Sequence, residues 1–334
     1  MSSVFPATYS TLCPSALASL LSQRYGLEKV RCKLIVRGVG DTYSVGSAAG
    51  SASDRFILRI YRSSHRSLPQ ITAETTLLTA LRQAKVSVSY PLPDLSGEMI
   101  QAIDAAEGRR YAVLFTYAPG RTVTRLNDNQ LRDLGHQMAR FHNVSSAIDL
   151  GGHRWNYDLQ TLLFQPLEMV RSAFEDIPEE YAWWQQAAKS AAEKLAQLNT
   201  STFSMGYCHF DFLPKNFHFE GDSVTFFDFD FLGYGWLVND IMTFWEQLCL
   251  DVHNGRMTQE AADEAYAVFL DAYREYRDLQ EEELSAIPYL ALGFWLFYMG
   301  FHMTHDEFYQ FVQPAVLKTR TGAIRQFMSK YWNK

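Results

Sequence analysis

Apolar and polar residues alternate along the first third of the chain, and apolar residues recur at helical spacing through most of the rest. Alternation over residues 33–45 and 55–61 predicts strands, because successive side chains of a strand point to opposite faces. Two further β segments are expected at residues 98–103 and 110–116. Residues 46–54, rich in Gly, Ala and Ser, predict a flexible hairpin loop between the first two strands.

Apolar residues three or four positions apart predict helices in the remaining regular structure. One helix is expected at residues 15–25 and another at 70–84, where the apolar stripe consists of Ile71, Leu77, Leu78 and Leu81. A Pro-Gly pair at residues 119–120 ends the β-rich part. Helices then follow at residues 128–142, 158–174, 178–198, 240–254, 258–277, 281–303 and 316–331. The pattern predicts an α+β chain with a small β-rich lobe, residues 1–118, and a large, mostly helical lobe, residues 119–334.

One β-rich island in the helical half carries the candidate chemistry. It reads GYCHFDFLPKN at residues 206–216 and, after a short interval, FFDFD at residues 226–230. The order His-x-Asp-x-x-x-x-Asn and then Asp-x-Asp is that of a phosphoryl-transfer site on a kinase-like catalytic loop. Such a site needs a carboxylate beside the attacking hydroxyl, and an amide and a second carboxylate that hold Mg²⁺ on the nucleotide phosphates. Asp211, Asn216 and Asp228 supply these groups in that order.

We interpret FFDFD as part of a strand whose phenylalanines face the core. Asp228 and Asp230 then share the opposite face, because side chains alternate along a strand. Two carboxylates one pleat apart repel each other unless a cation or donors lie between them, and Mg²⁺ favours such oxygen ligands together with phosphate oxygens. A solvated edge strand, with both aspartates facing water, is the competing interpretation.

Length, charge and cysteine content narrow the possible function classes. A chain of 334 residues with 47% hydrophobic and 20% charged residues is long enough for about two globular domains. The net charge of −7 argues against nucleic acid as a partner, because binding a phosphate backbone requires concentrated Lys and Arg. The four cysteines are scattered without CxxC spacing, which indicates reduced thiols in a cytoplasmic protein.

No membrane segment is expected. The N-terminal residues lack a basic segment followed by an apolar run, so no signal peptide is indicated. The longest apolar stretch, residues 288–303, is interrupted by Gly293, Gly300 and His302, and it is shorter than the roughly 20 residues that a membrane span requires. We expect this stretch to be a buried core helix.

These motifs give the chain a family resemblance. It resembles the aminoglycoside phosphotransferase and choline kinase superfamily, especially the bacterial phosphotransferase enzyme branch that includes type II homoserine kinase and a stress-response kinase. The resemblance spans residues 25–332 and is strongest at residues 206–240; LGHQMARFH at 134–142 and the hinge-like LFTYAPGR at 114–121 match more weakly. It implies a bilobal protein-kinase-like fold, with ATP and Mg²⁺ as cofactors.

The resemblance also implies roles for the matched residues of the second lobe. Asp211 would be the catalytic base that orients the acceptor hydroxyl and takes its proton. His209 would buttress the loop by hydrogen bonding, although a core histidine without a direct role fits the sequence equally well. Asp240 would anchor the catalytic loop. The implied metal ligands are Asn216 and Asp228, with Asp230 supporting the metal or a neighbouring turn.

In the first lobe the resemblance implies a phosphate-covering loop within GVGDTY at residues 38–43. Gly38, Gly40 and Thr42 would cover the nucleotide phosphates. Tyr43 occupies the position of the third glycine of G-x-G-x-x-G. A plain β-turn is the competing interpretation of this segment. The adenine site would be lined by Phe115, Thr116 and Tyr117.

Arg59 departs from the pattern of kinases, which usually carry Lys at this strand position. Arginine keeps its charge and can grip phosphate with two donors. Glu74, in the following helix, would be its ion-pair partner; an ordinary exposed helix glutamate is the alternative interpretation.

The acceptor site is expected in the helical lobe near Asp211. The candidate residues are Trp245, Glu246, Trp295 and His302, with Trp236, Tyr298, His305 and Asp306 as further members of the same group. Aromatic rings with carboxylates would suit a cationic amino alcohol through cation–π and ion-pair contacts. Packing of these rings in the core is the competing interpretation, and an amino sugar, a homoserine-like compound and a peptide serine all stay open as acceptors.

The leading hypothesis is therefore an ATP- and Mg²⁺-dependent kinase that transfers the γ-phosphoryl group to a hydroxyl of a small molecule. A protein Ser/Thr kinase of the stress-response type would use the same catalytic residues. A non-catalytic nucleotide-binding pseudokinase is a third hypothesis, motivated by Arg59 and the glycine-poor loop. A hydrolase is disfavoured, because the sequence has no Gly-x-Ser-x-Gly elbow.

Overall fold

The chain forms two compact units in a computed structural model that describes residues 5–47 and 55–332. Unit 1 comprises Met1–Arg121 together with Thr225–Phe227, and unit 2 comprises Thr122–Val224 and Asp228–Lys334. The sequence places the boundary after residue 118, whereas the packing of the chain places it after Arg121.

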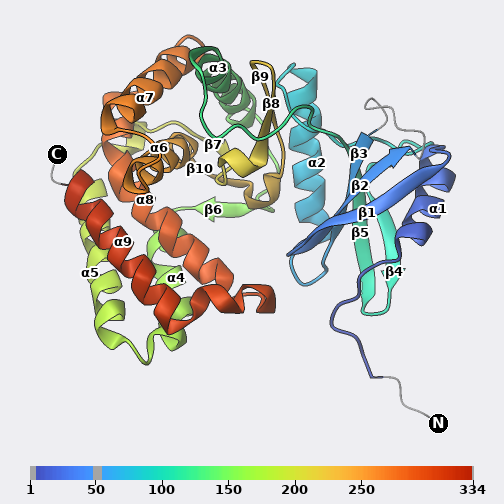
Figure 1. Cartoon of the computed structure of the whole chain (residues 1–334), viewed down its shortest axis with the longest axis horizontal. Helices are drawn as coiled ribbons and strands as arrows, with labels where there is room; N and C mark the ends of the chain where they lie inside the picture. Colours follow the sequence, from blue (N-terminus) through green and yellow to red (C-terminus); the bar gives the residue numbers. More distant parts are fainter. Residues whose placement is uncertain (1–4, 48–54, 333–334) are drawn as a thin grey trace. The chain divides into compact units, whose positions relative to one another are not determined.

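Unit 1 is built on an antiparallel sheet with the strand order β1-β2-β3-β5-β4 (Figure 1). Its strands are β1 (Val30–Arg37), β2 (Gly40–Ser47), β3 (Arg55–Tyr61), β4 (Gln101–Ala105) and β5 (Gly108–Thr116), and its helices are α1 (Pro14–Tyr25) and α2 (Leu68–Gln83). The β segment predicted at residues 33–45 consists of two strands, β1 and β2, which a tight turn at Gly38 separates. Of the predicted loop, Gly46 and Ser47 belong to β2, and residues 48–54 lie outside the described residues.

The core of unit 1 forms where α1 meets the sheet. Leu17 and Leu21 of α1 pack against the inward-facing residues of β2, β3 and β5, which are Tyr43, Val45, Leu58, Ile60, Ala112 and Leu114. Their spacing of two along each strand is the alternation that the sequence shows. The predicted stripe of α2 is buried as well, at Ile71, Leu77, Leu78 and Leu81.

Unit 2 is mostly helical, and its helices follow the predicted segments closely. They are α3 (Asp128–Ser145), α4 (Gln165–Val170), α5 (Pro178–Leu195), α6 (Val238–His253), α7 (Gln259–Arg274), α8 (Glu281–His302) and α9 (Pro314–Tyr331) (Figure 1). The helix predicted at residues 158–174 is irregular, since a π-helical turn (Gln160–Phe164) precedes α4 and a 3-10 turn (Arg171–Phe174) follows it. A further 3-10 segment, Asp306–Val312, was not predicted.

The short strands of unit 2 position the catalytic loop. A three-stranded sheet has the order β6-β10-β7, with β6 (Trp155–Tyr157), β10 (Gly233–Trp236) and β7 (Met205–Cys208). A separate hairpin pairs β8 (Phe217–Glu220) with β9 (Ser223–Phe226), whose last two residues are assigned to unit 1. The loop with Asp211 runs from the end of β7 to the start of β8, so both of its ends are fixed by strand pairing.

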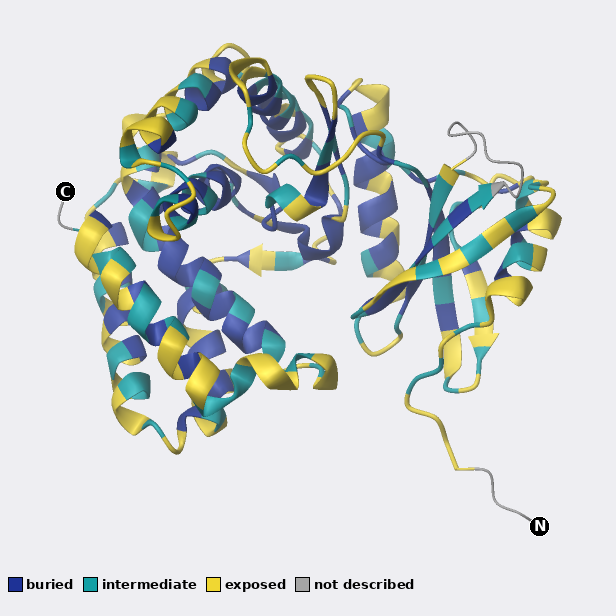
Figure 2. Cartoon of the chain, in the orientation of Figure 1, coloured by how far each residue is buried: buried dark blue, intermediate teal, exposed yellow. Residues whose placement is uncertain are grey.

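Helix α8 forms the centre of unit 2. By length and hydropathy it is apolar enough to cross a membrane, but most of its apolar window is buried inside the protein. Leu292, Leu296 and Met299 pack against buried residues of α4, α5 and α9, and Figure 2 shows the helix as largely dark blue. The predicted core helix at this position is confirmed.

The close crossing of α3 and α7 generates a stability prediction. A methyl group on Gly135 of α3 would overlap the carbonyl of Phe269 and the amide of Tyr273 on α7. We expect Gly135→Ala to lower the melting temperature, because overpacking against a backbone costs about 1–3 kcal/mol. Gly322→Ala on α9 is the matched control: nothing lies within 4 Å of the added methyl group, and helix propensity should stabilise that variant slightly. Equal shifts of both variants in a thermal unfolding experiment would contradict the close packing.

Candidate active site

The loop that carries Asp211 is held by the buried carboxylate of Asp240 on α6. Asp240 accepts the backbone N–H of His209 at 2.8 Å and that of Phe210 at 2.6 Å. Phe210 has a φ of 64°, a left-handed conformation that a bulky residue rarely adopts. The two charge-assisted hydrogen bonds therefore stabilise a strained backbone directly before Asp211. The resemblance implies this anchoring position for Asp240, and the hydrogen bonds match it.

Asp240 is itself fixed by a chain of buried groups. Nε2 of His142 on α3 lies 3.1 Å from Asp240 Oδ2, and Nδ1 of His142 lies 2.8 Å from the hydroxyl of Tyr273 on α7. Burial lowers the pKa of His142, and Asp240 opposes that shift. A neutral imidazole that donates Nε2–H to Asp240 and accepts the Tyr273 proton at Nδ1 satisfies both contacts. Two distant helices thus hold the catalytic loop.

Asp211 lies at the centre of the loop and is almost fully buried. Its Oδ2 accepts a hydrogen bond from Asn216 Nδ2 at 2.8 Å and pairs with Lys215 Nζ at 2.9 Å. Its Oδ1 is buried without a hydrogen bond of ordinary geometry among the described residues, although the hydroxyl of Tyr298 lies near enough for Asp211 to raise the pKa of Tyr298. A buried carboxylate oxygen without a well-formed hydrogen bond is costly, and this one is suited to accept the proton of a bound hydroxyl.

The aspartate pair does not lie on one strand face, and this part of the sequence interpretation is wrong. Strand β9 ends at Phe226, Asp228 has a φ of 63°, and residues Phe229–Phe231 form a 3-10 turn. A left-handed residue, which aspartate tolerates better than most, breaks the alternation. As a result Phe229 and Asp230 are both buried, whereas Asp228 is exposed.

Of the three predicted metal ligands, Asn216 and Asp228 have side chains suited to bind a metal, whereas Asp230 lies in a buried turn. Asn216 donates to both the carbonyl and the carboxylate of Asp211, which turns its own amide oxygen away from that residue. Asp228 presents an exposed carboxylate one residue after the strand. An amide oxygen and a carboxylate fit Mg²⁺, which uses few protein ligands together with waters and phosphate oxygens. Asp230 instead lies in the buried turn, where Arg154 donates to its backbone carbonyl and to those of Phe229 and Leu232.

His209 lies in the aromatic core beneath the loop. Its ring packs against Phe229, with a centroid distance of 4.5 Å, and against Phe212 at 5.6 Å. The hydrogen bond that ties this residue to Asp240 comes from its backbone N–H. His209 therefore packs beneath the loop, and its role in supporting the loop stays a prediction.

The nucleotide residues that the sequence predicts lie in unit 1. The turn that contains Gly38 closes through its N–H to the carbonyl of Gly40 at 3.1 Å, and Thr42 lies within β2, paired with Arg59 of β3. Tyr43, at the position of the missing third glycine, is buried and donates its hydroxyl proton to the carbonyl of Leu12. Tyr43 therefore belongs to the core.

The other predicted nucleotide residues of unit 1 differ in exposure. Glu74 of α2 is 2% exposed, so the interpretation as an ordinary exposed helix glutamate is wrong. Arg59 is half-buried and lies over the ring of Tyr61. Phe115 is buried in β5, and the half-buried Tyr117 stacks with the guanidinium of Arg55.

Three of the four predicted acceptor residues meet around one cavity of unit 2, of about 180 Å³. Glu246 of α6 faces Trp295 and His302 of α8 across it, and Tyr298 of α8 and Leu213 of the catalytic loop line the same space. Tyr298 connects the cavity to Asp211: burial and then the charge of Asp211 raise the pKa of Tyr298. The cavity therefore lies beside the catalytic loop.

The remaining acceptor candidates lie elsewhere. Trp245 packs edge-on against Phe327 and Tyr331 and does not line this cavity. Trp236 packs against Phe203. For both residues the core-packing interpretation holds, because a helix or strand that buries one face places its large rings there.

The sequence interpretation missed two cations near the site, Lys215 and Arg320. Arg320 of α9 lines the cavity, and one of its guanidinium nitrogens is buried without a hydrogen-bond partner among the described residues. Its position offers a sequence signal, because it lies three residues after the buried Leu317 and four before the buried Ile324. Charged residues are rarely buried on the apolar face of a helix, so a charge at such a position indicates a functional site.

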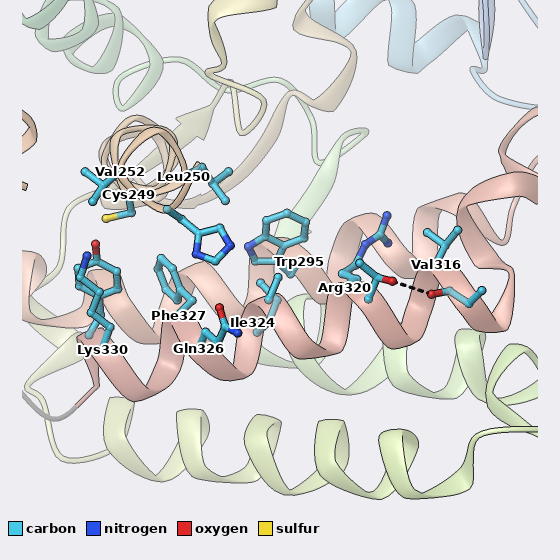
Figure 3. A pocket seen from close by; sticks show the side chains of 15 residues that line it. Cys249, Leu250, Val252, Trp295, Val316, Arg320, Ile324, Gln326, Phe327 and Lys330 are labelled. Carbon is cyan, nitrogen blue, oxygen red and sulfur yellow. Dashed lines mark hydrogen bonds between the residues drawn. The ribbon is translucent and has the colours of Figure 1, made fainter. Parts of the chain in front are cut away.

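Arg320 and Trp295 also line a larger hollow of about 690 Å³ between α6, α8 and α9. Figure 3 shows the two side chains close together, and the guanidinium carbon lies 5.9 Å from the centre of the indole ring. The stacked pair thus borders both spaces.

Comparisons with known proteins agree with this geometry. A model of the family described as the phosphotransferase enzyme family matches residues 31–282, more than half of the chain. The chain belongs to this family. An uncharacterized protein of Deinococcus radiodurans is 34% identical over 300 residues, which cover 89% of this chain and 84% of the relative.

Two solved structures share the fold of this family member. A microcompartment-associated aminopropanol kinase matches with a TM-score of 0.71 and 20% identity, over 94% of this chain and 98% of that chain. An amicoumacin kinase in complex with AMP-PNP, Ca²⁺ and Ami matches with a TM-score of 0.68 and 21% identity, over 92% of this chain and 93% of that chain. The predicted α+β kinase-like fold is confirmed.

Two buried glutamates of the phosphotransferase generate a prediction about stability. Glu246 has no hydrogen-bond partner of ordinary geometry among the described residues, and burial raises its pKa well above the usual value. A carboxyl group with a raised pKa destabilises the fold increasingly as the pH rises above its unfolded value of about 4.3. Glu246→Gln should therefore raise the melting temperature by a few degrees near pH 8 and by less near pH 5.

Glu283 on α8 is the matched control for that substitution. It is equally buried, but its carboxylate accepts the backbone N–H of Ser204 at 2.9 Å and that of Gln280 at 3.0 Å. Glu283→Gln should lower the melting temperature, because charge-assisted hydrogen bonds to backbone are lost. A decrease in both variants would contradict the assignment of Glu246 as a residue that costs stability in the free protein.

Proposed function

We propose that this member of the phosphotransferase enzyme family transfers the γ-phosphoryl group of ATP to a hydroxyl of a small molecule. The observation that carries the proposal is the environment of Asp211, a buried carboxylate beside a cavity: donors bind its Oδ2, and its Oδ1 makes no hydrogen bond of ordinary geometry to the described residues. The relatives named for aminopropanol and amicoumacin act on small molecules, and one of them binds an ATP analogue.

The proposed reaction needs little covalent chemistry from the protein. The acceptor oxygen forms a bond to the γ-phosphorus while the bond between that phosphorus and the β–γ bridging oxygen breaks, and ADP leaves with the electron pair. Asp211 orients the hydroxyl and takes its proton. Asn216 and Asp228 would hold Mg²⁺, which would neutralise charge on the phosphates when bound.

Lys215 helps to orient the proposed base. Its ammonium lies 2.9 Å from Asp211 Oδ2, on the oxygen that also accepts from Asn216. The two donors fix the carboxylate plane, so that Oδ1 is the oxygen left for the acceptor. Positioning of this kind accounts for much of phosphoryl-transfer catalysis.

In unit 1, we propose that the turn at Gly38 and Gly40, with Thr42, covers the nucleotide phosphates. Arg59 and Glu74 would form the phosphate-gripping pair, with arginine in place of the usual lysine. Phe115 and Tyr117 would line the adenine site.

The cavity favours a small acceptor over a protein. Its volume of about 180 Å³ lies below the roughly 300–1,000 Å³ of sites for drug-sized ligands. Its walls come from three helices and the catalytic loop, whereas a peptide serine would need an extended groove. The protein Ser/Thr kinase is therefore the weaker hypothesis.

Substitution of the proposed base and metal ligand tests this function. Asp211→Asn should reduce transfer of phosphate to a hydroxyl acceptor by about 10²–10⁴-fold, while Mg²⁺–ATP still binds, because Asp211 contacts the acceptor. Asp228→Asn should raise the Mg²⁺ concentration required for half-maximal activity. Both effects are measurable by ³¹P NMR on ATP, Mg²⁺ and a panel of small amino alcohols and hydroxy acids.

Asp222→Asn is the control, since Asp222 lies in the turn of the β8–β9 hairpin and accepts hydrogen bonds from the exposed side chains of Asn127 and Asn129. Its activity should equal that of the unsubstituted protein. Full activity of Asp211→Asn would remove Asp211 from the proposed role. Labelled phosphate on protein alone would favour the protein kinase, and ATP binding without any transfer would favour the pseudokinase.

A further inference from the structure

A buried acidic group and a buried basic group line the cavity beside the catalytic loop. Glu246 is 1% exposed, and neither of its carboxylate oxygens has a hydrogen bond of ordinary geometry within the described part of the chain. The indole N–H of Trp295 lies near enough to oppose the rise in the pKa of Glu246, but burial is the larger effect. Apart from this contact with Trp295, no described residue pairs with the carboxyl group.

Arg320 supplies the positive charge on the same cavity. Its guanidinium is largely buried, which lowers its pKa, and one of its nitrogens is buried without a hydrogen-bond partner among residues 5–47 and 55–332. An arginine stays charged inside proteins. No ion pair joins it to Glu246 or to another described carboxylate, although the two groups line one cavity.

The third titratable group of the cavity is neutral. Burial, and then the charges of Arg320 and Lys215, lower the pKa of His302 to about 4. Its Nδ1 is buried without a hydrogen-bond partner within the described residues. His302 therefore adds a polar but uncharged group, and Glu246 and Arg320 are the acidic and the basic group of the cavity wall.

Buried charges without partners are costly, and proteins rarely keep them without a ligand or a function. If the two groups served each other, they would form an ion pair across the cavity. Instead, the carboxyl oxygens of Glu246 and an N–H group of Arg320 stay available to a ligand in the cavity. A ligand with one cationic and one anionic group can pair with both Glu246 and Arg320, whereas a purely cationic amino alcohol leaves Arg320 unpaired.

We propose that the acceptor of this kinase is a small zwitterion, such as a hydroxy amino acid, with its ammonium group bound by Glu246 and its acid group bound by Arg320. This inference rests on the proposed function for its third contact, the hydroxyl at Asp211. Tyr298 lines the cavity and senses the charge of Asp211, and Leu213 belongs to the loop of Asp211, so the hydroxyl end of the ligand faces the catalytic loop.

A set of three probes tests the two charges separately. L-Homoserine carries an ammonium, a carboxylate and a primary hydroxyl. 3-Aminopropan-1-ol is the same molecule without the carboxylate, and 4-hydroxybutanoate is the same molecule without the ammonium. Binding of each probe is measured by titration calorimetry on the full chain, separately from phosphate transfer.

The proposal predicts a crossed pattern of dissociation constants. Each charge-assisted contact is expected to strengthen binding by about 10- to 100-fold, so the unsubstituted protein should bind L-homoserine more tightly than either fragment. Glu246→Gln should weaken L-homoserine and 3-aminopropan-1-ol but leave 4-hydroxybutanoate unchanged. Arg320→Met should weaken L-homoserine and 4-hydroxybutanoate but leave 3-aminopropan-1-ol unchanged.

The control is Arg325→Met on the same helix, because Arg325 pairs with Glu180 and does not line the cavity. It should leave all three dissociation constants unchanged. A uniform loss for all probes in Glu246→Gln or Arg320→Met would indicate a structural role and overturn the inference. Equal affinity of the unsubstituted protein for L-homoserine and 3-aminopropan-1-ol, or no binding of L-homoserine at millimolar concentration, would overturn it as well.

The same samples separate this inference from the proposed function. If the crossed binding pattern appears but no phosphate reaches L-homoserine from Mg²⁺–ATP, the zwitterion site stands and the kinase assignment fails. If 3-aminopropan-1-ol is phosphorylated as efficiently as L-homoserine, and Arg320→Met does not change that ratio, the kinase assignment stands and the zwitterion site fails.

Discussion

The carboxylate of Asp240 is the constraint on which the site depends. It accepts the backbone N–H groups of His209 and Phe210, and its buried partner His142 links it to Tyr273. Without these hydrogen bonds the left-handed backbone of Phe210 would relax, since a bulky residue in that region costs about 1–3 kcal/mol. The direction of the Asp211 side chain follows from that backbone. The proposed catalytic base is therefore positioned by a second acidic group, Asp240.

Stability and function oppose each other around the cavity. Asp240 and Glu283 are buried carboxylates whose charges are satisfied by backbone N–H groups, so they stabilise the fold. The carboxylate of Glu246, one guanidinium nitrogen of Arg320 and Oδ1 of Asp211 are buried without a hydrogen bond of ordinary geometry among the described residues. Such groups cost free energy in the free protein and become favourable when a ligand pairs with them. The contrast between satisfied and unsatisfied buried charges distinguishes structural residues from candidate binding residues.

The sequence predicts the fold well, because long segments with helical periodicity, such as those of α2 and α8, are compatible with few structures other than a helix. It also predicts the grouping of Asp211 with Asn216, since both lie on one short loop. The strand alternation at Asp228 and Asp230 is wrong because a single left-handed residue ends β9, and backbone handedness is not visible in apolar patterning. Arg320 escapes prediction for another reason: it lies more than a hundred residues from Asp211, and only the packing of α9 against α6 and α8 brings it to the cavity.

The most direct test of the central claim is the Asp240→Asn variant. Its amide can accept only one of the two backbone N–H groups well, so the catalytic loop should loosen while unit 1 keeps its structure. Hydrogen exchange should accelerate in the peptide that spans residues 207–213 and stay unchanged in the strands of unit 1. The rate of phosphate transfer should fall, while the affinity for Mg²⁺–ATP should change little. Full activity and unchanged exchange in Asp240→Asn would contradict the claim that this carboxylate positions Asp211.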